Sequence, residues 1–145
     1  MRIDLDYFKR LLVPFLESEN AHITIDDWQQ NGIEIYTGNR TVNEKFLFHI
    51  TLLAENGLIS DQDLETYSLD SVGLITYLSG EMQFVKKPLR LTQKGHDFAN
   101  ILENSEVLNR LKSDFKNMTF DVILDSGKAI ISAFAKKKLT ELGLN

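Results

Sequence analysis

The sequence has no cysteine, only two prolines among 145 residues, and no apolar run that approaches the ~20 residues of a membrane-spanning helix. Without cysteine there are no disulfide bonds, zinc thiolate sites or thiol nucleophiles. We therefore expect a cytoplasmic protein without a membrane partner. Positive charge is also scarce, because 16 Lys and Arg stand against 21 Asp and Glu and the formal net charge is -5. DNA binding would need a local basic patch, since phosphate-binding surfaces carry an excess of Lys and Arg.

Sequence patterns typical of catalytic sites are missing as well. The three histidines, His22, His49 and His96, are scattered, and no two have the i, i+4 spacing of metal ligands on one helix. There is no glycine-rich phosphate loop, nucleophile elbow or paired carboxylate motif. For His96 we favour a bond to a backbone carbonyl near a helix start over a role as a base or ligand, and for His49 we also favour a structural role. We expect no enzyme activity, no metal, no cofactor and no small-molecule substrate.

The stretch over residues 41–59 predicts one helix followed by a strand. Its apolar residues recur at helical spacing and predict a buried face, which consists of Val42, Phe46, Ile50 and Leu53. Asn56 and Gly57 are residue types that tolerate the left-handed conformation at a helix end. The apolar pair Leu58 and Ile59 then enters the strand.

An apolar stripe over residues 4–17 predicts a first helix, which Asp4 or Asp6 caps. Pro14 lies inside this stripe and deletes a backbone hydrogen bond, so we expect the helix to kink or restart there. Residues 23–36 show no helical period. A turn at Asn31-Gly32 and the alternation over 33–35 predict a short edge strand.

Residues 66–91 are rich in β-branched and aromatic side chains and predict two or three short strands, the last of which covers 89–91. Both leucines of this last strand are expected in the core, with Arg90 facing outward. The strand runs into a helix that Thr92 caps, and Gly95 marks a place where a neighbouring backbone comes close.

The C-terminal part, from about residue 104, reads as two helices, the first capped by Ser105 and the second beginning at Thr119. The second helix carries an apolar seam that consists of Phe120, Ile123, Leu124, Gly127, Ile130, Ile131 and Phe134. Such a seam is buried either on its own domain or on a second copy of the chain.

Two segments, Leu91–Phe98 and His49–Ile59, resemble a family of small bacterial and prophage proteins that is classed as a domain of unknown function. The opening Met1–Asp6 is similar to the start of that family, and the motif Leu-Thr-x-x-Gly-His-x-Phe is the most specific part. The resemblance covers nearly the whole chain. It implies an α+β class with a winged-helix-like domain over residues 1–103 and a C-terminal two-helix extension over 104–145. In such a domain the helix over 41–55 would be the one that lies in a DNA groove. The resemblance implies no activity and no functional residue.

In a winged helix, the strand hairpin within residues 66–91 would be the wing. Candidate nucleic-acid-binding residues are the cations near the start of the helix over 41–55, those of this predicted wing and one at the start of the next helix, namely Arg40, Lys45, Lys86, Lys87, Arg90 and Lys94. An equally good interpretation of the last four is a solvated sheet edge, where lysines prevent aggregation. Candidate protein-interaction residues form two apolar strips, one with Phe48 and Leu52, the other with Ile123, Ile130 and Phe134.

Two functions follow from these patterns. The leading hypothesis is a non-catalytic regulator-like protein with a winged-helix framework that binds double-stranded DNA. The alternative is a protein-interaction module that keeps this framework without binding DNA, with a homodimer or another protein as partner through the C-terminal helices. A continuous positive face that includes Arg40, Lys45 and residues 86–94 would favour DNA, whereas its interruption by Glu44 and Glu55 would favour protein.

Overall fold

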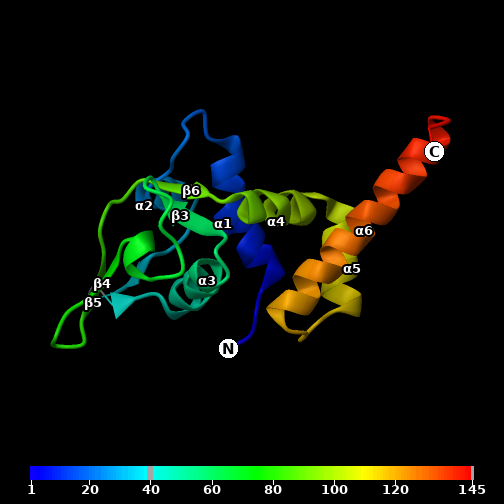
Figure 1. Cartoon of the computed structure of the whole chain (residues 1–145). Coiled ribbons are helices and arrows are strands. Elements are labelled where there is room, and N and C mark those ends of the chain that lie inside the picture. Colours follow the sequence, from blue (N-terminus) through cyan, green and yellow to red (C-terminus); the bar gives the residue numbers. More distant parts are fainter. Residues whose placement is uncertain (39–40, 145) are drawn as a thin grey trace.

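The computed structural model describes residues 1–38 and 41–144, and it confirms the α+β class (Figure 1). The helices are α1 (Leu5–Glu17), α2 (Ile25–Gln30), α3 (Glu44–Glu55), the short 3-10 helix η1 (Asp70–Val72), α4 (Gln93–Glu103), α5 (Ser105–Asp114) and α6 (Phe120–Glu141). The strands are β1 (Tyr36–Thr37), β2 (Thr41–Val42), β3 (Ile59–Asp61), β4 (Leu74–Thr76), β5 (Met82–Phe84) and β6 (Leu89–Leu91).

The strands form antiparallel pairs that connect distant parts of the chain. β1 pairs with β2, β3 with β6, and β4 with β5. Ile23 forms an isolated bridge with Leu89, so Ile23, β6 and β3 lie side by side. The β4–β5 hairpin is inserted in the chain between β3 and β6 and projects on the side opposite α5 and α6 (Figure 1).

Helix α1 begins where predicted, because the Asp4 side chain accepts a hydrogen bond from the backbone N–H of Tyr7. The helix does not restart at Pro14 but continues to Glu17. Pro14 deletes one backbone hydrogen bond, to the carbonyl of Arg10, but its own carbonyl accepts from the N–H of Ser18 at 3.1 Å, so the last turn is still closed. The apolar side of α1 packs against α4.

Residues 23–36 lack a helical period in the sequence, but they contain the short helix α2. Thr24 and Asp27 form a capping box at the start of α2. The Asp27 carboxylate accepts from the backbone N–H of Thr24, and the Thr24 hydroxyl accepts from the backbone N–H of Asp27. Trp28 is fully buried and its indole N–H donates to the carbonyl of Leu11 at 2.9 Å. The segment 33–35 does alternate between buried and exposed residues, but it is not a strand, and strand pairing begins at Tyr36.

Helix α3 is shorter than predicted because residues 41–42 form β2, and Asn43 caps the helix. Its predicted face is confirmed, since Phe46, Ile50 and Leu53 are fully buried. Gly57 adopts φ 66° after the helix, and the chain then enters β3 as predicted.

The junction between β6 and α4 also follows the prediction. The Thr92 hydroxyl accepts from the N–H of Gly95 and donates to the carbonyl of Gly57. A Cβ atom on Gly95 would overlap the carbonyl oxygen of Leu58, which confirms the close backbone approach.

Helix α5 is capped by Asn104 rather than by Ser105, which is its first residue. Helix α6 is capped by Thr119 as predicted, and it packs against α4 and α5. The Phe120 ring lies 5.2 Å from Phe98 and 6.2 Å from Phe8 between centroids, so the start of α6 belongs to the same core as α1 and α4. Its C-terminal end, from residue 135 to residue 141, is exposed and projects from the body (Figure 1).

Candidate functional site

The expected nucleic-acid-binding cations do not form one free positive surface. Arg40 lies outside the described residues. The Lys45 ammonium lies 2.7 Å from the Asp4 carboxylate and 4.9 Å from the centre of the Tyr7 ring. Lys45 is therefore bound to the start of α1.

The two lysines between β5 and β6 are also in ion pairs. Lys86 lies 2.7 Å from Asp26, and this carboxylate raises the pKa of Lys86 by its hydrogen bond and its charge. Lys87 lies 3.4 Å from Asp61 and donates to the carbonyl of Asp70 at 3.1 Å. These contacts fix both side chains against acids of the same chain.

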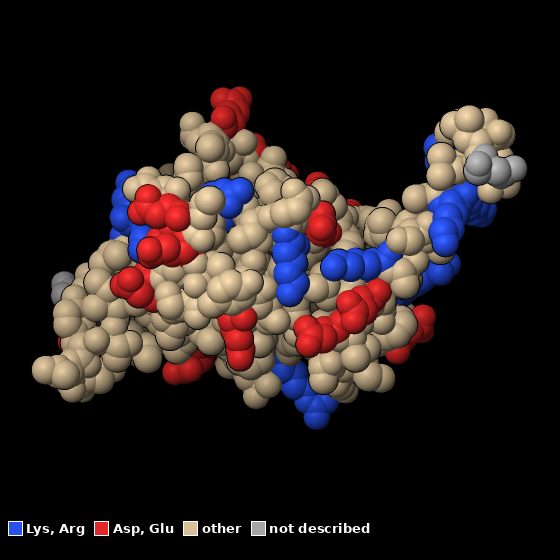
Figure 2. All heavy atoms as spheres, in the orientation of Figure 1, with Lys and Arg blue, Asp and Glu red and all other residues tan. Residues whose placement is uncertain are grey.

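Arg90 and Lys94 are the remaining candidates of this group. The Arg90 guanidinium lies 3.4 Å from the Ser60 hydroxyl. Neither Arg90 nor Lys94 has an ion-pair partner within residues 1–38 and 41–144. On the face drawn in Figure 2, acidic and basic side chains alternate over the body of the molecule. A continuous positive face is not present in this view.

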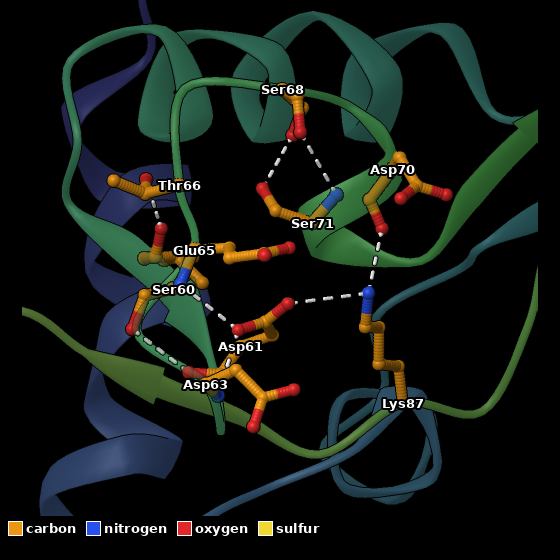
Figure 3. Close-up of polar contacts among 10 residues, drawn as sticks. Ser60, Asp61, Asp63, Glu65, Thr66, Ser68, Asp70, Ser71 and Lys87 are labelled. Atoms are coloured by element: carbon orange, nitrogen blue, oxygen red, sulfur yellow. Dashed lines mark hydrogen bonds and ion pairs between the residues drawn. The ribbon is translucent and has the colours of Figure 1, made fainter.

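Asp61 is the centre of a polar cluster that joins β3 to the loop after it and to Lys87 (Figure 3). Its residue surface is only 2 % exposed, and Oδ1 accepts from the N–H groups of Asp63 and Glu65 at 2.9 and 3.0 Å. Burial acts to raise the pKa of Asp61, but the two N–H donors and the Lys87 ammonium outweigh it and lower the pKa below its usual value. Asp61 and Lys87 thus connect β3 to the segment before β6.

His49 has the structural role that the sequence favoured. The ring is fully buried; Nε2 accepts from the N–H of Asp4 at 3.0 Å, and Nδ1 lies 2.7 Å from the carbonyl of Lys45. Because Nε2 is an acceptor, Nδ1 carries the proton and the ring is neutral. Burial lowers the pKa of His49. With both nitrogens bound to backbone, the ring has no free atom for proton transfer.

His96 differs from its prediction. The residue is exposed, and its ring makes no hydrogen bond to the described part of the chain, so the expected bond to a backbone carbonyl is wrong.

The outward side of α3 is only partly open to solvent. Glu44 and Glu55 are exposed, whereas Phe48 and Leu52 are half-buried. The start of α1 covers the first turns of the helix, because Asp4 contacts both Lys45 and His49. The exposed cation of this helix, Lys45, is paired with Asp4, and the remaining outward groups are acids and apolar side chains.

A cleft of about 830 Å³ lies between residues 1–6, α3 and the connection between α5 and α6. Phe48 lines it from α3, Leu111 from α5, Phe115 from the residue that follows α5, and Ile123 from α6. Two of the predicted interaction residues, Phe48 and Ile123, therefore meet in one cleft, and α6 does not close over Phe48. The other members of the two apolar strips lie elsewhere.

Leu52 packs against the core, and Ile130 and Phe134 lie half-buried farther along α6. The Arg110 guanidinium of α5 lies 5.4 Å from the centre of the Phe134 ring. The sequence did not identify Arg2, Lys112 and Lys116 as cleft residues, because only the fold brings residues 1–6 next to residues 111–118.

The described residues contain no group of three or more His, Asp or Glu side chains placed to hold a metal ion. Within the same part of the chain, every helix is too short or too polar to cross a membrane. Comparisons with protein-family models, with curated proteins and with solved structures give no match. The resemblance to small bacterial and prophage proteins therefore stays a prediction.

Proposed function

We propose that this chain is a non-catalytic protein-interaction module that keeps a winged-helix-like framework without using it to bind DNA. The order of elements supports the framework: α1, the strand position at Ile23, α2, α3, β3 and β6 follow one another, and Ile23, β6 and β3 form the small sheet beside the helices. The insertion of η1 and the β4–β5 hairpin enlarges the wing.

The observation that carries the proposal is the pairing of the candidate cations with acids. Lys45, Lys86 and Lys87 each lie within 3.4 Å of a carboxylate of the same chain. A phosphate would have to displace these carboxylates, and the released acid would repel it. We therefore expect an acidic protein whose cations are paired in this way to have a low affinity for the DNA backbone.

The tip of the β4–β5 hairpin supports the same conclusion. It carries Tyr77 and the fully exposed Leu78, and the sequence from Thr76 to Glu81 contains no Lys or Arg. Cations supply most of the affinity for phosphate, and this tip has none, whereas exposed apolar side chains such as Leu78 are typical of contacts with protein.

Binding to mixed-sequence double-stranded DNA at about 50 mM and about 200 mM salt tests the proposal, because phosphate contacts weaken steeply with added salt. We expect no measurable binding by fluorescence anisotropy at either salt concentration. The control variants Arg90→Ala and Lys94→Ala change the two cations without ion-pair partners in the described chain.

The second candidate function is DNA binding through Arg90 and Lys94, which have no acid beside them in the described chain. Salt-sensitive binding that both alanine variants weaken would establish this function and contradict the interaction-module proposal. Each lost phosphate contact would then flatten the salt slope by about one unit.

A further inference from the structure

We infer that the cleft between residues 1–6, Phe48 and the α5–α6 connection binds an acidic amphipathic helix of a partner protein. This inference rests on the proposed function as an interaction module and names the chemistry of its partner. In Figure 1 the N-terminus lies near the start of α6, where the cleft forms.

The charges of the cleft leave a positive excess. Its two acids are already neutralised within the chain, since Asp4 pairs with Lys45 at 2.7 Å and Asp6 with Lys112 at 2.9 Å. Arg2 and Lys116 also line the cleft, and both are exposed and have no ion-pair partner among the described residues. A positive cleft on a chain of net charge -5 favours an anionic occupant.

The apolar side chains of the cleft give the occupant an apolar side as well. Leu111 and Ile123 are buried and form its floor, while Phe48 and Phe115 are half-buried at its walls. Met118 is 48 % exposed at the rim, and a flexible methionine adapts to different apolar surfaces. An occupant that covers these groups removes apolar area from water.

The open rim of the cleft favours one side of a bound helix over an enclosed small molecule. Its volume of about 830 Å³ is within the ~300–1,000 Å³ range of ligand sites, so size alone does not decide. Small-molecule sites bury most of the ligand, however, and here the rim residues Met1 and Met118 are themselves largely exposed. A bound helix can place its apolar side on the floor and keep its other side in water.

The cleft is formed before any partner binds. The Lys112–Asp6 ion pair joins α5 to the start of α1. Between the two tail helices, the N–H of Met118 donates to the carbonyl of Phe115 at 3.2 Å, and Asn117 adopts φ 66°. Asn tolerates this left-handed conformation better than most residues, so the turn keeps a defined shape. A preformed site loses less conformational entropy on binding.

Selection from a display library of random 16-residue peptides on the full chain tests the inference. We expect enriched peptides to combine Asp or Glu with apolar residues at helical spacing. The double variant Arg2→Glu/Lys116→Glu should weaken their binding by about tenfold, because two exposed charge contacts become repulsive. Met118→Asp should also weaken it, since the charge lies at the apolar rim.

The matched control is Lys136→Glu/Lys137→Glu, which reverses two exposed charges on the projecting end of α6 far along the chain from the cleft. This control should bind the selected peptides as the parent does, and circular dichroism should show unchanged folding in all variants. Enriched peptides that lack acids, or that bind the Arg2→Glu/Lys116→Glu variant equally well, would overturn the inference.

Sedimentation of the chain without peptide addresses a second copy as occupant. Self-association that Arg2→Glu/Lys116→Glu abolishes would place another copy of the chain in the cleft and would also overturn the inference. A different result, salt-sensitive DNA binding, would contradict the proposed function itself. A chain that binds neither DNA nor acidic peptides keeps the proposed function and loses the cleft as its site.

Discussion

Single acidic residues determine what the lysines of this protein contact. Asp4 and Asp26 bind Lys45 and Lys86, and Asp61 binds Lys87. The first two pairs are exposed and contribute little to stability. Asp61 differs, because its side chain is only 3 % exposed and accepts two backbone N–H bonds in addition to the lysine contact. Its charge is therefore important for the contact between β3 and the segment that holds Lys87.

We predict that Asp61 makes stability sensitive to acid. The fold lowers the pKa of Asp61, so its charge stabilises the fold above the ordinary aspartate pKa of 3.8, and this contribution is lost as pH falls through the lower pKa of the folded state. Urea unfolding should show Asp61→Asn to be less stable than the parent at pH 7 by about 1–3 kcal/mol. The difference should shrink at pH 3.

The exposed acid Asp63 provides a control at the same turn, because it contributes its N–H rather than its carboxylate to Asp61. Asp63→Asn should keep the stability of the parent at both pH values. Equal stability of Asp61→Asn and the parent at pH 7 would mean that the Asp61 carboxylate does not stabilise the fold.

At the scale of elements, short caps and close backbone approaches position the helices. Thr92 caps α4 and also binds the carbonyl of Gly57, so one hydroxyl connects the end of α3 with the start of α4. Gly95 allows this contact, because any side chain there would overlap the carbonyl of Leu58. The α3–β3 and β6–α4 segments therefore pack as one unit.

We predict that Gly95→Ala lowers the melting temperature by several degrees, since an overpacked site that must move backbone costs about 1–3 kcal/mol. Gly127→Ala is the matched control on α6. Its Cβ would lie 2.7 Å from Cγ2 of the buried Ile101, so a side chain rather than a backbone carbonyl must give way, and Ala is a better helix former than Gly. We therefore expect Gly127→Ala to lower the melting temperature less than Gly95→Ala does. Thermal unfolding in which Gly95→Ala matches the parent would rule out the close approach.

At the scale of the whole molecule, one core extends from α1 to the first half of α6. The core cluster includes Phe8, Phe98, Leu111 and Leu124, which come from both sides of residue 104. Beyond Phe134 the helix is exposed and continues away from the body (Figure 1). The division into domains over residues 1–103 and 104–145 stays a prediction. The first half of α6 packs in the core, whereas its last residues are exposed to solvent.

We predict that the two halves of α6 respond differently to truncation. A chain that ends at Ala135 loses residues 136–144, which are all exposed, together with Asn145, and should keep its melting temperature and its near-ultraviolet circular dichroism. A chain that ends at Asn117 exposes the rings of Phe8 and Phe98, which Phe120 covers, and should be molten or aggregated. A folded monomer from the shorter chain would show that the core does not need α6.

Local patterns were enough to predict several elements. The helices α1, α3, α4 and α6 have an apolar period and a capping residue that lie within the same segment, so their existence could be read from neighbouring residues. The start of α2 had a local signal too, the capping pair Thr24 and Asp27, although the lack of periodicity concealed it. Gly57 and Gly95 were identified because left-handed turns and close contacts favour glycine.

The sequence by itself determined the α+β class, most helices and the buried face of α3, because side-chain periodicity and caps act over a few residues. Only the tertiary structure decided which charges are free. Lys45 meets Asp4 and Lys87 meets Asp61 across long stretches of chain, and residues 1–6 meet 111–118 in the cleft. The charge of a lysine is visible in the sequence, but its ion-pair partner depends on folding, which brings distant segments within the few ångströms over which such pairs form.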